Sequence, residues 1–125
     1  MNDTENAALS ALASLDAAAL RAVVLGWARL ATGRGVQSLT TAAALDDLYA
    51  GPSGDHGATR AGLEHLAGSP PGERPSGRRV GHVLRRRVRG RAVAGFDGGD
   101  VVLVAEGRTN GATRWRVLPV PSLPG

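Results

Sequence analysis

The sequence contains no cysteine and no lysine. Without cysteine, disulfides and thiolate metal sites are excluded. Without lysine, a Schiff-base lysine and a lysine-bearing phosphate loop are excluded. Aromatic residues are also scarce, so leucine, valine and alanine must fill most of the modest core that a single domain of 125 residues can form.

The N-terminal segment MNDTENAALS carries no basic residue, and no uncharged apolar run approaches the ~18 residues typical of a membrane span. We therefore expect a cytoplasmic protein that makes no contact with a membrane.

The patterns of known enzyme sites are missing as well. The glycine-rich segment GPSGDHG at 51–57 lacks the Gly-Lys-Ser/Thr of a phosphate-binding loop. Asp46 and Asp47 are adjacent, so on a helix they point about 100° apart and cannot act as paired carboxylates. The remaining candidate metal ligands match no known spacing: Asp55, His56, Glu64 and His65. We predict no enzymatic activity, no catalytic residue, no metal and no cofactor.

The charge, in contrast, is strongly divided along the chain. Residues 1–70 carry four arginines against seven acidic residues, a net charge of −3. Residues 71–125 carry eleven arginines against four acidic residues, a net charge of +7. Codon bias alone can produce an arginine excess, but this asymmetry also indicates an anionic partner for the second half.

Three main helices and one short helix are predicted in the first half. A helix at 16–32, with Asp16 as its N-cap, follows a short helix at about 4–13. Further helices are expected at 40–50, capped by Thr40 or Thr41, and at 59–67, capped by Thr59. The helix at 16–32 has an apolar stripe at helical spacing that would suit homodimerisation: Leu20, Val23, Val24, Trp27 and Ala31.

Ser76 caps the fourth main helix, predicted at 77–88. Its apolar face carries Val80, Val83, Leu84 and Val88, and Arg87 falls in the middle of that face. Five basic side chains occupy the opposite face: Arg78, Arg79, His82, Arg85 and Arg86.

The remainder reads as β-structure, with strands at 91–96, 101–107 and 113–119. Asn110-Gly111 between the last two favours a two-residue hairpin turn, because both residues tolerate a positive φ. Trp115 and Val117 share one face of the final strand, and Arg114 and Arg116 share the other.

A capped basic helix followed by a hairpin is the plan of an α+β winged helix-turn-helix domain. We predict an N-terminal helical extension at 1–36, a winged-helix domain at 37–120 and a tail at 121–125. The helix at 77–88 would be the recognition helix in the DNA major groove, and 108–112 the tip of the wing.

Two segments, SGRRVGHVLRRRVRGRAVAGF and VVLVAEGRTNGATRWRV, carry a family resemblance. They resemble the winged-helix C-terminal tails of actinobacterial and phage replication proteins of the primase–helicase type, over about the last third of the chain. The resemblance implies DNA binding without primase or ATPase chemistry. The matching residues are Arg85, Arg86, Arg87, Arg89, Gly90, Arg91, Gly95, Gly107, Arg108, Gly111, Trp115, Arg116 and Val117.

The sequence therefore predicts a double-stranded DNA-binding protein, either a transcriptional regulator or a replication accessory factor. Two alternatives stay open: a winged-helix module that binds another protein, and an RNA-binding protein, although no exposed aromatic strand is expected for base stacking. The predicted nucleic-acid-binding residues are Arg78, Arg79, His82, Arg85, Arg86, Arg89, Arg91, Arg108, Asn110, Arg114 and Arg116.

Overall fold

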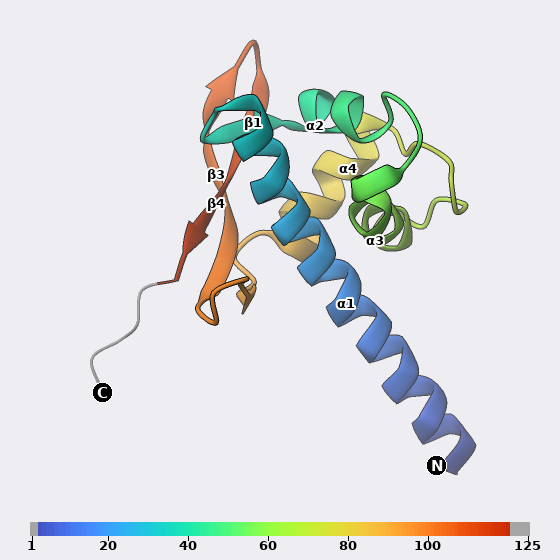
Figure 1. Cartoon of the computed structure of the whole chain (residues 1–125). Helices are drawn as coiled ribbons and strands as arrows, with labels where there is room; N and C mark the ends of the chain where they lie inside the picture. The colour runs from blue at the N-terminus through green and yellow to red at the C-terminus, as the bar shows by residue number, and fades with distance from the viewer. Residues whose placement is uncertain (1–2, 121–125) are drawn as a thin grey trace, which may run out of the picture.

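The computed structural model describes residues 3–120, so the tail predicted at 121–125 lies outside the described residues. Within this range the chain forms four α-helices and one four-stranded antiparallel sheet, which confirms the predicted α+β class (Figure 1). The helices are α1 (Asp3–Arg34), α2 (Thr41–Leu48), α3 (Gly57–Ala67) and α4 (Gly77–Val83). The strands are β1 (Ser38–Thr40), β2 (Val93–Ala94), β3 (Asp100–Thr109) and β4 (Ala112–Pro119).

Helix α1 is a single 32-residue helix, not the two predicted helices. The alanine-rich segment before Asp16 has high helix propensity and contains no breaker, so the helix runs through it. The prediction that Asp16 is an N-cap is therefore wrong. Its carboxylate lies in mid-helix and accepts a 2.7 Å hydrogen bond from His65 Nε2 of α3.

The second half of α1 lies in the core of the domain. Val23, Val24 and Trp27 are almost fully buried, and the Trp27 indole donates a 3.1 Å hydrogen bond to the backbone carbonyl of Trp115. These residues therefore do not form an extension, and the stripe predicted for homodimerisation is covered by the protein itself. By length and composition α1 could also cross a membrane, and 22% of its apolar 18-residue stretch is buried within the protein.

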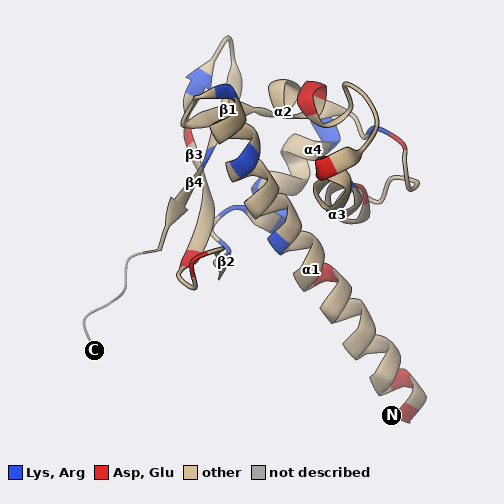
Figure 2. Cartoon of the chain, in the orientation of Figure 1, with Lys and Arg blue, Asp and Glu red and all other residues tan. Residues whose placement is uncertain are grey.

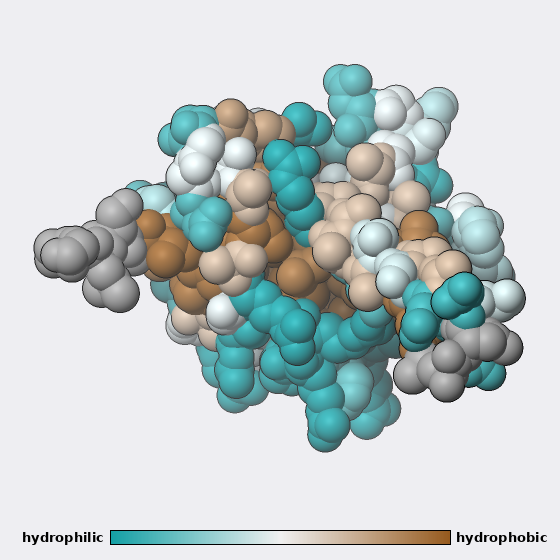
Figure 3. Space-filling view, turned by 90° about the horizontal axis from the view of Figure 1, so that it is seen from below, coloured by the Kyte–Doolittle hydropathy of each residue, from teal (hydrophilic) through white to brown (hydrophobic). Residues whose placement is uncertain are grey.

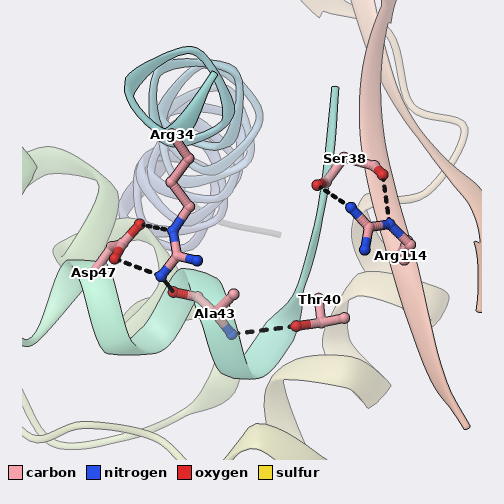
Figure 4. Close-up of polar contacts among 6 residues, drawn as sticks. All are labelled: Arg34, Ser38, Thr40, Ala43, Asp47 and Arg114. Carbon is pink, nitrogen blue, oxygen red and sulfur yellow. Dashed lines mark hydrogen bonds and ion pairs between the residues drawn. The ribbon is translucent and has the colours of Figure 1, made fainter. Parts of the chain in front are cut away.

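Helices α2 and α3 pack beside α1 with their predicted leucines buried. Thr40 is the N-cap of α2, as predicted, and its hydroxyl accepts a hydrogen bond from the Ala43 amide (Figure 4). Thr59 is not the cap of α3, because α3 begins two residues earlier, after the turn η1 (Gly54–His56). The Thr59 side chain is instead buried against α1.

Two glycines allow α1 and α3 to approach closely. A Cβ at Gly26 of α1 would lie only 2.0 Å from the Thr59 hydroxyl oxygen. A Cβ at Gly62 of α3 would lie 2.9 Å from the backbone oxygen of Ala19. The contact between these helices therefore depends on the absence of side chains at both positions.

The sheet has the strand order β1-β4-β3-β2. The β3–β4 hairpin turns at Asn110-Gly111 with positive φ at both residues, as predicted. The strand predicted at 91–96 is reduced to β2, because the chain turns back at Gly95, whose amide bonds the Gly99 carbonyl at 2.7 Å. Strand β1 was not predicted, and it pairs with β4 through Leu39 and Trp115.

Arginine side chains fix the corner between α1, β1 and α2 (Figure 4). Arg34 at the end of α1 makes a bidentate ion pair with Asp47 of α2, with distances of 2.6 and 2.8 Å. Arg114 of β4 donates to the hydroxyl and to the backbone carbonyl of Ser38, at 2.8 and 2.9 Å. The guanidinium groups thus position β1 on the edge of the sheet.

A buried carboxylate holds the loop that leads into α4. Glu64 of α3 is almost fully buried and accepts hydrogen bonds from the Tyr49 hydroxyl at 2.5 Å and from the Gly72 amide at 2.8 Å. Burial and the neighbouring Glu64 raise the pKa of the Tyr49 hydroxyl to about 12. Glu64 therefore has a structural role and is not a metal ligand candidate.

We expect Tyr49 to titrate near pH 12, which the ultraviolet absorbance of tyrosinate measures directly because the sequence contains a single tyrosine. In unfolded protein it should titrate near 10. Between these two pH values the folded state keeps the tyrosine proton and the unfolded state loses it. The contact therefore contributes on the order of 2 kcal/mol to the free energy of unfolding below pH 10, and this contribution is lost as the pH rises toward 12. A Tyr49 titration near pH 10 in the folded protein would contradict the buried contact.

Candidate nucleic-acid interface

The helical segment from Gly77 to Val88 begins at the predicted residue, and its predicted apolar face is buried. Ser76 caps it, and its hydroxyl accepts a hydrogen bond from the Arg79 amide at 3.2 Å. One face packs into the core through Val80, Val83, Leu84 and Val88, all of them buried. The other face is thereby fixed toward solvent, so the basic residues on it have a defined orientation.

The last turn of this segment is a π-helix, η2 (Leu84–Val88), in which the Arg89 amide bonds the Leu84 carbonyl at 2.8 Å. This wider turn explains Arg87, which a regular helix would place on the apolar face. Arg87 instead reaches the edge of the helix, where it donates to the Leu66 carbonyl at 3.2 Å and lies 3.5 Å from the Asp16 carboxylate.

Eight of the fifteen arginines have partners within the protein. Four pair with an acidic side chain, namely Arg34, Arg74, Arg87 and Arg116. Arg21, Arg60 and Arg114 donate to backbone carbonyls, and Arg29 lies 4.7 Å from the centre of the Phe96 ring. These guanidinium groups therefore already have partners within the protein.

The other seven arginines have no hydrogen bond or ion pair within residues 3–120, and their side chains are exposed. Six lie in or directly after the α4–η2 segment, and the seventh is at the hairpin tip: Arg78, Arg79, Arg85, Arg86, Arg89, Arg91 and Arg108. We call these the unpaired arginines. Figure 2 shows the basic segments that contain them on α4, on the chain that follows it and near the end of the β3–β4 hairpin.

The stretch from Arg78 to Arg91, which carries six of the unpaired arginines, has a single sign of charge. No acidic residue interrupts the sequence from Arg74 to Asp97. His82 is exposed on the same side, and a shallow groove at the start of α4 is lined by Ser76, Arg78, Arg79 and His82. Figure 3 shows hydrophilic side chains in several groups around the edge of this face of the molecule, with hydrophobic side chains between them. The α4–η2 segment thus presents an exposed basic face. Such a surface is complementary to closely spaced anionic groups.

The hairpin contributes fewer residues than predicted. Arg114 is committed to Ser38 and to the Thr109 hydroxyl, and Arg116 to Glu106 at 3.0 Å, so both hold the sheet together. Arg108 and Asn110 remain exposed at the tip. Val101 of β3 pairs with β2, and Arg108 lies seven residues further along β3. At ~3.3 Å per residue the two are roughly 23 Å apart.

The described residues offer no other site of comparable definition. No group of three or more His, Asp or Glu side chains in residues 3–120 could hold a metal ion. Sequence reasoning missed β1 and the π-turn, and hence the engagement of Arg87 and Arg114. The mid-face position of Arg87 was the one visible signal of an irregular turn.

Comparisons with protein-family models, with curated proteins and with solved structures found no match.

Proposed function

We propose that this protein is a winged helix-turn-helix protein that binds double-stranded DNA. The α4–η2 segment would act as the recognition helix and the β3–β4 hairpin as the wing. The observation that carries the proposal is the segregation of the arginines: those with partners are spread over the fold, whereas the unpaired ones cluster on one helix and one hairpin tip.

The order of the elements supports the winged-helix arrangement. A short strand, β1, precedes α2 and pairs with β4, and the hairpin follows α4 after the small strand β2. A three-stranded antiparallel β1-β4-β3 arrangement anchors the hairpin beside the helices. Trp115 of β4 is buried in the same core as the apolar face of α4, so the hairpin is attached rigidly to that core.

The dimensions also suit a duplex. The B-DNA major groove, ~12 Å wide, admits one α-helix, and arginine can bind a guanine or a phosphate with two parallel hydrogen bonds. The tip, roughly 23 Å along β3 from the position that pairs with β2, would reach the backbone beyond the groove that the helix occupies. Arg85, Arg86 and Arg89 would lie at the groove, and Arg108 at the adjacent backbone.

The proposal is tested by fluorescence anisotropy with three labelled probes of equal length: a random-sequence duplex, a single strand and an RNA hairpin. We expect the duplex to bind most tightly at low salt. Equal binding of all three would indicate a general polyanion surface, and preference for the hairpin would favour the RNA-binding alternative. No binding to any probe at low salt would refute a nucleic-acid function.

A further inference from the structure

One of the unpaired arginines, Arg85, lies against a glycine of its own helix. Gly81 is in the middle of α4 and is buried, although its neighbour His82 and Arg85 itself are exposed. A Cβ built on Gly81 would lie 3.5 Å from Arg85 Nη1, 3.8 Å from Nη2 and 4.0 Å from Cζ. These are the nearest atoms outside the helix backbone and the adjoining residues, so the Arg85 guanidinium covers Gly81.

This contact follows from helix geometry. Residues four positions apart lie on the same face of a helix, and side chains point back toward the N-terminus. Arg85 therefore reaches back over Gly81, where the missing side chain leaves space for the guanidinium. An alanine methyl at this position would be in ordinary van der Waals contact with the guanidinium, whereas a branched side chain would occupy the same space.

Packing between helices does not account for this glycine. At Gly26 and Gly62 an added Cβ would lie 2.0 and 2.9 Å from atoms of the neighbouring helix. At Gly81 the three nearest atoms all belong to Arg85, and none belongs to another element. Glycine is also among the least favourable residues in a helix interior. The feature that uses the open position is therefore the Arg85 side chain.

The backbone that carries Arg85 is fixed as well. Val80 and Leu84, on the apolar side of the same turns, are fully buried. Arg89, in contrast, follows the end of the helix, and Arg108 lies close to the tip of the hairpin. Arg85 is therefore held both at its backbone and at its guanidinium.

The guanidinium of Arg85 nevertheless keeps its donors available. It makes no hydrogen bond or ion pair within residues 3–120. The N–H donors of a guanidinium form a planar fork that matches two oxygens of one phosphate. A side chain that is already held in place loses less conformational entropy on binding than a mobile one, so it binds the same group more tightly.

We propose that Gly81 is a positioning residue for Arg85, and that the Arg85 guanidinium held on it is the anchoring phosphate contact of the recognition helix. Its ligand is one phosphodiester group of the duplex backbone, bound through two parallel hydrogen bonds. The inference rests on the proposed DNA-binding function. It adds that the geometry of Arg85, and not its charge alone, determines the affinity.

Three single variants separate the geometry of Arg85 from its charge. Gly81→Val places two γ-carbons beside the guanidinium, and the stiff χ1 of valine in a helix keeps both from turning away. Anisotropy with the random-sequence duplex should show about tenfold weaker binding, with the salt slope unchanged because the charge remains. Arg85→Lys should behave in the same way, whereas Gly81→Ala should bind like the wild type.

A double variant tests whether Gly81 acts through Arg85. R85A/G81V should bind no more weakly than R85A, and circular dichroism should show the wild-type melting temperature for G81V. An equal loss from G81V with and without Arg85 would overturn the proposal, because the valine would then obstruct the duplex itself. Wild-type affinity in G81V would also overturn it and would leave DNA binding intact. Failure of the wild type to bind duplex would overturn the proposed function together with this inference.

Discussion

The double substitution R85A/R86A is expected to lower the affinity for duplex DNA about 100-fold, or ~1.4 kcal/mol for each arginine. Both side chains are exposed on the α4–η2 segment and have no partner within residues 3–120. Their removal therefore leaves no buried group unpaired, and the thermal stability of the protein should be unchanged. Anisotropy titrations with the labelled duplex measure the affinity.

The matched control for this prediction is R60A/R74A, which removes the same charge from elsewhere on the surface. Arg60 lies over Tyr49 and donates to the Gly51 carbonyl, and Arg74 pairs with Asp46. We expect less than a threefold change in affinity from this control. An equal loss in both variants would mean that net charge, and not the α4–η2 face, determines binding.

The substitution Gly26→Ala should destabilise the fold by about 3 kcal/mol, at the upper end for overpacking. The new Cβ would lie 2.7 Å from the Thr59 Cβ, an atom fixed to the backbone of α3, so the helices themselves must separate. In a protein whose total stability is on the order of 5–15 kcal/mol, this is a large fraction. Thermal or urea denaturation followed by circular dichroism gives the value.

Two further variants separate overpacking from a general effect of alanine. Gly33→Ala, in the last turn of the same helix, meets no atom within 4 Å and should stabilise the protein by up to ~1 kcal/mol. Thr59→Ala in the Gly26→Ala background should recover part of the loss, because it removes the two nearest atoms. A Gly26→Ala variant as stable as the wild type would show that α1 and α3 are not in close contact.

Local rules predicted much of the second half of the chain. The Ser76 cap, the buried valines of the fourth helix and the positive-φ turn at Asn110-Gly111 depend on neighbouring residues, and the structure confirms them. Strand β1 depends on pairing with β4, more than seventy residues away, and its three residues have no local signal of their own. Short segments of this kind cannot be predicted from periodicity.

The errors in the first half have a common physical cause. Asp16 and Thr59 have side chains suited to helix N-caps, but both are used in contacts between helices, Asp16 with His65 and Thr59 against Gly26. Similarly, the sequence gives no indication that Arg114 and Arg116 would be engaged within the sheet while Arg85 and Arg86 would not. Tertiary partners decide which charged residues remain available.

The salt dependence of duplex binding tests the central claim, that the unpaired arginines bind the phosphates of DNA. If all seven make such contacts, log Kd against log salt for the wild type should have a slope of magnitude about 6, reduced by about 2 in R85A/R86A and unchanged in R60A/R74A. A wild-type slope near zero, or the same slope in all three proteins, would contradict the claim.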